Sequence, residues 1–157
     1  MRPNSETEQV QIGNPGILKE ELLMLKARDI MNKNIVSVKK DTPIFEAVKL
    51  LVENNISCLP VIEDDMTLVG ILSEKDVVEL FYESEQAENK AVNDYMTYPA
   101  VYFEDNNALL NVCNFLVKNI FRRVPITSEG KLVGIISVKD VLFFVLQLRR
   151  KKVGGTN

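Results

Sequence analysis

The sequence predicts an α+β fold in which two pseudo-twofold-related β-α-β-β-α repeats pack into one compact module, with an N-terminal amphipathic helix in front of them. Two observations lead to this prediction: a stretch of sequence occurs twice in the chain, and both copies show the same order of strand and helix patterns. The chain has 157 residues, 46% of them apolar and 26% charged, which suits a single compact soluble domain with a hydrophobic core.

The repeat is visible in single residues. Each copy holds an Asp-x-Met opening, an apolar-Pro-apolar motif and a Leu-Val-Gly-Ile-x-Ser-x-x-Asp motif. The pairs are Asp29-x-Met31 with Asp94-x-Met96, Leu59-Pro60-Val61 with Val124-Pro125-Ile126, and residues 68–76 with residues 132–140. The first two pairs are 65 positions apart and the third is 64 apart, so the second copy lacks one turn residue. Two such units packed about a pseudo-twofold axis form two equivalent clefts, which are natural ligand sites.

Apolar periodicity predicts the elements of each repeat. In the first repeat we expect a strand at 35–38, a helix ending near residue 54, strands at 56–62 and 68–72, and a helix from 73 to 81. In the second we expect a strand at 100–103, a helix at 108–118, strands at 124–127 and 132–136, and a helix from 138 to about 151. The order is the same in both copies.

The chain divides into six predicted segments. They are a flexible N-terminal segment (1–14), an N-terminal helix (15–27), repeat 1 (28–83), a polar linker (84–92), repeat 2 (93–148) and a basic C-terminal tail (149–157). The N-terminal helix has apolar residues at helical spacing and needs an apolar surface on which to rest.

Composition excludes several classes of protein. A net charge of −3 and a pI near 5.1 provide no general attraction to nucleic acid or to an anionic membrane. The longest apolar run, residues 141–146, is too short to span a bilayer, and the first residues lack the pattern of a signal peptide. We therefore expect a cytoplasmic protein with neither a nucleic-acid nor a membrane partner.

The chain has no histidine, which removes the commonest general base and the commonest zinc ligand. Its two cysteines, Cys58 and Cys113, occupy different positions in the two repeats and are expected to be small core residues. We therefore expect no metal site, no catalytic cofactor and no enzymatic activity.

The repeated motifs resemble those of the tandem cystathionine-β-synthase-type domain, or CBS domain, whose pairs are called Bateman modules. The resemblance covers residues 27–148. It implies a regulatory module that binds an adenosine-containing ligand, AMP, ADP, ATP or S-adenosylmethionine, in the two clefts and often forms disc-shaped dimers.

The Ser-x-x-Asp motif has two interpretations. A serine at the start of a helix lies beside unpaired backbone N–H groups that favour phosphate, and the carboxylate three residues later can accept hydrogen bonds from the hydroxyls of a ribose. The same spacing is close to that of a capping box, which only starts a helix.

The resemblance assigns residues to a preferred cleft and to a second cleft. The preferred cleft takes Asn34, Ile35, Val36, Ile56, Ser57, Cys58, Arg122, Arg123, Ser137, Lys139 and Asp140. The second cleft takes Pro99, Ala100, Val101, Ile120, Phe121, Arg122, Ser73, Lys75 and Asp76.

The two clefts differ at the end where a phosphate would bind. Arg122 and Arg123 supply two guanidinium groups to the preferred cleft, whereas Ser57 and Cys58 stand at the equivalent positions. We therefore expect the cleft at Asp140 to be the better site for a phosphorylated ligand. The alternative is that the arginines are a solvated basic pair on a strand edge.

The last helix is apolar almost all round, with Leu142, Phe143, Phe144 and Leu146 among its residues. Either a second copy of the chain covers this helix, through the helices that follow each Ser-x-x-Asp motif, or the N-terminal helix does so within one chain. The leading functional hypothesis is a homodimeric sensor of adenine nucleotides that signals to an unknown regulated protein. The alternatives are an interaction scaffold without a ligand and an enzyme that acts on the nucleotide.

Overall fold

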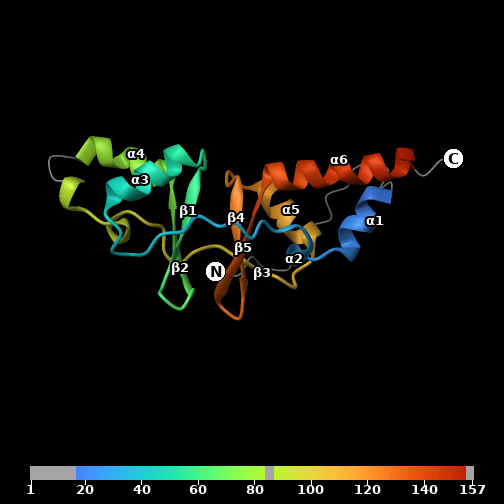
Figure 1. The fold of residues 1–157 in the computed structure, drawn as a ribbon, viewed down its shortest axis with the longest axis horizontal. Helices are drawn as coiled ribbons and strands as arrows, with labels where there is room; N and C mark the ends of the chain where they lie inside the picture. Colours follow the sequence, from blue (N-terminus) through green and yellow to red (C-terminus); the bar gives the residue numbers. More distant parts are fainter. Residues whose placement is uncertain (1–16, 84–86, 155–157) are drawn as a thin grey trace.

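The computed structural model describes residues 17–83 and 87–154, and these form two similar halves side by side (Figure 1). The elements are α1 (Ile17–Met24), α2 (Ala27–Ile30), α3 (Ile44–Glu53), β1 (Cys58–Ile62), β2 (Leu68–Ser73), α4 (Glu74–Glu83), η1 (Ala87–Asn89), η2 (Val92–Asp94), β3 (Phe103–Glu104), α5 (Leu109–Lys118), β4 (Arg123–Ser128), β5 (Lys131–Ser137) and α6 (Val138–Gly154). The predicted duplication is confirmed, since α3-β1-β2-α4 recurs as α5-β4-β5-α6.

The two sheets repeat the same register. Strands β1 and β2 pair antiparallel with Pro60 opposite Ile71, and β4 and β5 pair antiparallel with Pro125 opposite Ile135. In both pairs of strands the register shifts one residue after the proline, between residues 61 and 62 and between residues 126 and 127. Strand β3 adds a parallel partner to β4 in the second half. The strands are therefore equivalent down to the position of the bulge.

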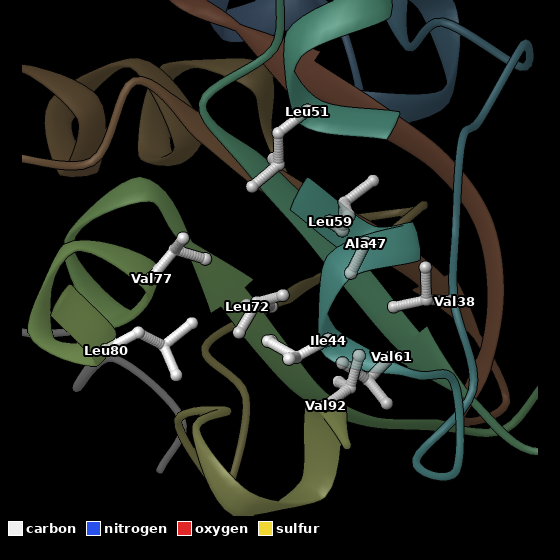
Figure 2. Close-up of a cluster of buried hydrophobic side chains, with 10 residues drawn as sticks. All are labelled: Val38, Ile44, Ala47, Leu51, Leu59, Val61, Leu72, Val77, Leu80 and Val92. Atoms are coloured by element: carbon white, nitrogen blue, oxygen red, sulfur yellow. The ribbon is translucent and has the colours of Figure 1, made fainter. Parts of the chain in front are cut away.

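Each half has its own hydrophobic core on the helix side of its sheet. Figure 2 shows the first core, which contains Val38, Ile44, Ala47, Leu51, Leu59, Val61, Leu72, Val77, Leu80 and Val92. The second core contains Ala27, Phe103, Leu109, Val112, Leu116, Val124, Ile126 and Ile136. In both halves alternate strand residues point toward the helices because successive side chains of a strand face opposite sides.

The opening segments of the two repeats are exchanged between the halves. Ala27 belongs to the sequence of repeat 1 but is completely buried in the core of repeat 2. Val92, which lies just before repeat 2, is completely buried in the core of repeat 1. The opening of each repeat thus contributes a buried residue to the core of the other.

The hairpin tips also join the two halves. The Leu68 N–H donates to the Gly130 carbonyl (3.1 Å), and the Leu132 N–H donates to the Met66 carbonyl (2.9 Å). The Lys131 ammonium forms an ion pair with Asp65 at 2.7 Å. The acidic turn that carries Asp65 is longer than its counterpart at 128–131, and residues of both hairpins make the contact.

Several predicted boundaries need correction. The strand predicted at 35–38 is reduced to one parallel bridge, from Val38 to Val61, and the strand predicted at 100–103 begins only at Phe103. The N-terminal helix ends at Met24 instead of residue 27, because Leu25 and Lys26 are extended and pair with the start of α5. The predicted basic tail is helical up to Gly154. The predicted flexible segment 1–14 lies outside the described residues.

Candidate functional site: two helix starts at the contact between the repeats

Both Ser-x-x-Asp motifs form a reciprocal cap at the start of a helix. At α6 the Ser137 N–H donates to Oδ2 of Asp140 (2.8 Å), and the Asp140 N–H donates to the Ser137 hydroxyl oxygen (3.1 Å). At α4 the corresponding distances for Ser73 and Asp76 are 2.8 and 3.2 Å. The capping interpretation is therefore confirmed at both positions.

The cap leaves hydrogen-bonding capacity at each helix start. Its bond to the carboxylate uses Oδ2 of Asp140, and within the described part of the chain no bond reaches Oδ1. Ser137 is buried and Asp140 is half-buried. The first turn of α6 also carries N–H groups without partners in the helix, although the Val138 N–H already donates to the Arg122 carbonyl (2.9 Å). Capping and ligand binding can thus use different atoms of the same motif.

Residues 33–37 cross from one half of the molecule to the other. Asn32 exchanges two backbone hydrogen bonds with Ile135 of β5, at 2.8 and 3.0 Å, and Val38 exchanges two with β1, at 3.0 and 2.9 Å. Asn34, Ile35 and Val36 therefore lie on a bridge that starts near the end of β5, two residues before Ser137. These three residues are the ones that were predicted for the preferred cleft.

An equivalent crossing lies in the other direction. Thr97 exchanges two backbone hydrogen bonds with Ile71 of β2, at 2.8 and 3.0 Å, and Phe103 pairs with Ile126 of β4. Residues 98–102 thus connect the end of β2, near Ser73, with the second half. Pro99, Ala100 and Val101, which were predicted for the second cleft, lie on this crossing.

The residues before the two prolines lie where the halves meet. The Glu74 N–H donates to the Ser57 carbonyl (2.9 Å), just as the Val138 N–H donates to Arg122. Cys58 is buried in a small cluster with Ile71 and Ala100. Burial raises the pKa of the Cys58 thiol to about 11, and the nearby positive charge of Arg123 opposes this rise. Cys58 thus shares a buried cluster with Ala100 of the 98–102 crossing and lies within electrostatic reach of Arg123.

The remaining predicted residues are distributed as follows. Arg122, Lys75 and Lys139 are exposed and Arg123 is half-buried, and none of them forms an ion pair with another described residue. Val36 and Ile56 are half-buried against the core of repeat 1. Ile120 is 77% exposed, and Phe121 is 40% exposed and stacks on Phe115 at 5.9 Å. Assignment of these residues to a ligand stays a prediction.

Sequence reasoning missed two features of this region. Cys58 and Ala100, which were assigned to different clefts, lie in one small buried cluster. The exchange of opening segments was also missed, although the Asp-x-Met motif before each unit was a signal for it. Among the described residues no group of three or more His, Cys, Asp or Glu side chains could hold a metal ion. No helix within residues 17–83 and 87–154 has the length and apolar character needed to cross a membrane.

Two halves that share the order helix-strand-strand-helix, with exchanged openings and paired Ser-x-x-Asp helix starts, define a tandem pair of CBS domains. The CBS domain sequence profile matches residues 27–83 and 92–147, and the chain belongs to this family.

Over the aligned residues, the relatives are about one third identical to the chain. A protein of Methanocaldococcus jannaschii, MJ1225, is 32% identical over 115 residues, which are 73% of this chain and 41% of that protein. The chloroplastic CBS domain-containing protein CBSX2 of Arabidopsis thaliana is 30% identical over 152 residues, covering 79% of this chain and 64% of that protein. Hypoxic response protein 1 of Mycobacterium tuberculosis is 32% identical over 119 residues, covering 75% of this chain and 83% of that protein. The chain thus spans only part of the first two relatives.

Solved structures have the same fold. The crystal structure of CBSX2 in complex with AMP superimposes with a TM-score of 0.71 at 33% identity, covering 79% of this chain and 98% of that one. A hypoxic response protein structure with two coordinated zinc ions has a TM-score of 0.66 at 29% identity, covering 76% and 98%. The CBS domain pair of MJ0100 has a TM-score of 0.66 at 23% identity, which supports the fold alone.

Proposed function

We propose that the chain is a regulatory module that binds an adenine nucleotide at the contact between its two CBS repeats and has no catalytic activity of its own. The observation that carries this proposal is the crossing of residues 33–37 from β5 to β1, because it brings backbone and apolar side chains of repeat 1 to the capped start of α6. A flat purine fits between apolar residues and backbone polar groups, and a ribose hydroxyl suits the free carboxylate oxygen of Asp140.

The AMP complex of CBSX2 supports the choice of ligand class. Within this class the preferred cleft is the one at Asp140, because the Arg122 carbonyl accepts the Val138 N–H at the start of α6 and Arg123 follows directly. A guanidinium group binds phosphate with two hydrogen bonds at once, so we expect AMP, ADP or ATP to bind more tightly than an uncharged adenosine. S-adenosylmethionine is the alternative ligand.

We further propose that the module works as a homodimer and passes its signal to a separate protein. The exposed face of α6 supports this, since Leu142, Phe143 and Leu146 are 59, 60 and 51% exposed. Helix α1 packs against α5 and leaves these three side chains open to solvent. A nucleotide changes such a dimer only if it binds one arrangement more tightly than another.

Thermal unfolding in the presence of AMP, ADP, ATP, S-adenosylmethionine and GTP tests the proposal. A ligand at one hundred times its dissociation constant stabilises the native state by about 2.7 kcal/mol, which raises Tm by roughly 5 to 10 °C. Asp140→Ala should abolish the rise, and the matched variant Asp76→Ala should retain it. Both variants lose an equivalent cap, so the comparison separates ligand binding from helix stability. A wild-type protein that responds to none of these ligands would favour the scaffold hypothesis.

A further inference from the structure

The turn between α5 and β4 exposes three large apolar side chains within five residues. Val117, Ile120 and Phe121 are 83, 77 and 40% exposed. Single exposed apolar residues are common on a protein surface, whereas a group of them marks a site of interaction. This group, called the apolar turn below, is therefore a candidate contact surface.

The corresponding turn of repeat 1 has the same hydrogen-bonded frame. The side-chain amides of Asn54 and Asn119 each donate to the carbonyl four residues earlier, at 2.9 Å. In both repeats the carbonyl just before the strand, at residue 57 or 122, accepts an N–H from the start of the next helix, also at 2.9 Å. The two turns are thus held in the same way.

The surfaces of the two turns differ. Repeat 1 has the polar Asn55 where repeat 2 has Ile120, and it has the half-buried Ile56 where repeat 2 has Phe121. A repeat therefore folds without a large exposed apolar side chain at either position. The apolar character of residues 120 and 121 is a property of repeat 2 that the shared frame does not require.

The charge around the two turns differs as well. Residues 117–123 and 137–140 hold four basic residues and one acidic residue, a net charge of +3. The equivalent residues 52–58 and 73–76 hold one basic and three acidic residues, a net charge of −2. Arg122 follows the apolar turn directly and is exposed. The surface is thus complementary to a chain segment that carries carboxylates beside apolar side chains.

We propose that the apolar turn and Arg122 dock a segment of the regulated protein in which large apolar side chains alternate with Asp or Glu. The apolar side chains anchor the segment, and the guanidinium group binds a carboxylate with two hydrogen bonds. Phe121 stacks on Phe115, with ring centroids 5.9 Å apart and ring planes 13° apart, and the Asn119 amide caps α5. The turn is therefore already ordered, which reduces the entropy lost on binding.

Arg122 also connects this surface to the nucleotide. A phosphate that occupies the paired donors of its guanidinium group makes them unavailable to a carboxylate, and the phosphate charge repels the docked segment. AMP should therefore displace the segment, whereas adenosine, which has no phosphate, should leave it bound. This step rests on the proposed binding of AMP in the preferred cleft, while the docking surface itself does not.

Panning a random dodecapeptide library on the whole protein tests the docking surface. The enriched peptides should combine Leu, Ile, Phe or Trp with Asp or Glu. The most enriched peptide, synthesised with a fluorescent label, should bind about tenfold more weakly to Ile120→Asn and to Val117→Ser. Val52→Ser, at the equivalent and 74% exposed position of repeat 1, is the matched control and should bind like the wild-type protein. A lack of enrichment, enrichment of basic peptides or an equal loss in the control would overturn the proposal.

Fluorescence polarisation with the same peptide tests the competition. Saturating AMP should raise the apparent dissociation constant of the peptide by at least about tenfold, and saturating adenosine should leave it unchanged. Displacement by adenosine would place the peptide in the purine slot of the second cleft and so contradict the docking surface. Thermal shifts with AMP, recorded on the same samples, show whether a missing competition comes from a failure of nucleotide binding.

Sedimentation velocity excludes self-association as the role of the apolar turn. Ile120→Asn and Val117→Ser should sediment like the wild-type protein at equal concentration. A change in the oligomeric state of either variant would assign the apolar turn to a contact between copies of the chain and overturn the proposal.

Discussion

Met31 packs directly on Gly134, so closely that a β-carbon at position 134 would lie 2.5 Å from the Met31 sulfur and 2.9 Å from the Met31 Cβ. The contact joins the opening segment of repeat 1 to β5 of repeat 2. An equivalent contact joins Met96 to Gly70, where an added β-carbon would lie 2.9 Å from the sulfur and from the Thr97 carbonyl oxygen. In both contacts, therefore, the methionine of an Asp-x-Met motif packs on the glycine of a Val-Gly-Ile motif in the other half.

Gly134→Ala should destabilise the fold by about 1 to 3 kcal/mol, because the methyl group overpacks the contact with Met31. Chemical denaturation measures this loss. In a double-mutant cycle, Gly134→Ala combined with Met31→Ala should lose less free energy of unfolding than the sum of the two single variants, since the shorter side chain makes room. If the two losses of free energy were strictly additive, the added methyl group would not clash with the Met31 side chain.

Replacing Arg122 and Arg123 together by alanine should weaken the binding of AMP by roughly 10- to 100-fold, the usual effect of losing hydrogen bonds between charged groups. Binding of uncharged adenosine should change little, because the ribose acceptor Asp140 is retained. Isothermal titration calorimetry with both ligands measures the difference. The control Lys49→Ala removes an exposed cation on α3, outside both predicted clefts, and an equal loss in this control would argue against a specific role for the arginines.

The ion pair between Asp65 and Lys131 should make stability depend on pH in acid. The hydrogen bond from the Lys131 ammonium holds the pKa of the Asp65 carboxyl well below its ordinary value of 3.8. A group with a lowered folded-state pKa stabilises the fold above its unfolded-state pKa and loses this effect as pH falls through the folded-state pKa. Tm should therefore fall less steeply between about pH 5 and pH 2 in Asp65→Asn than in the wild-type protein. Glu129→Gln, on the neighbouring hairpin, is the control and should follow the wild-type curve.

The thiol of Cys58 should react slowly in the native protein. It is 8% exposed, and burial raises its pKa to about 11, so the reactive thiolate is scarce near neutral pH. Because the folded-state pKa lies above the ordinary 9.0, the contribution of this thiol to stability is present below pH 9.0 and is lost as pH rises toward 11.

Mass spectrometry after maleimide treatment measures the reactivity of this thiol. AMP should slow the reaction further, because Cys58 is among the residues predicted for the preferred cleft, whereas Cys113 on α5 should be insensitive to AMP. Rapid labelling of Cys58 at neutral pH, before unfolding, would contradict its buried position.

Much of the fold follows from the sequence because it depends on local and repeated patterns. The two apolar-Pro-apolar strands, the hairpins after them and both Ser-x-x-Asp caps are short-range features, so their residue types predict them. Residues 34–36 and 99–101 were assigned to opposite clefts and lie on opposite crossings between the halves, and their role in binding a ligand stays a prediction. The strand predicted at 35–38 failed because its residues alternate like a strand but find only one partner, at Val61.

The sequence alone predicts the duplication, the order of elements within each repeat and the residues that start α4 and α6, because each of these depends on a few adjacent positions. The tertiary structure was needed to show that Ala27 lies in the core of repeat 2, that Val92 lies in the core of repeat 1 and that Cys58 and Ala100 share one buried cluster. These contacts depend on which surface each segment can bury once both halves have formed. The apolar residues in segments 26–32 and 91–97 indicate that each segment packs against an apolar surface, but they do not indicate which half supplies that surface.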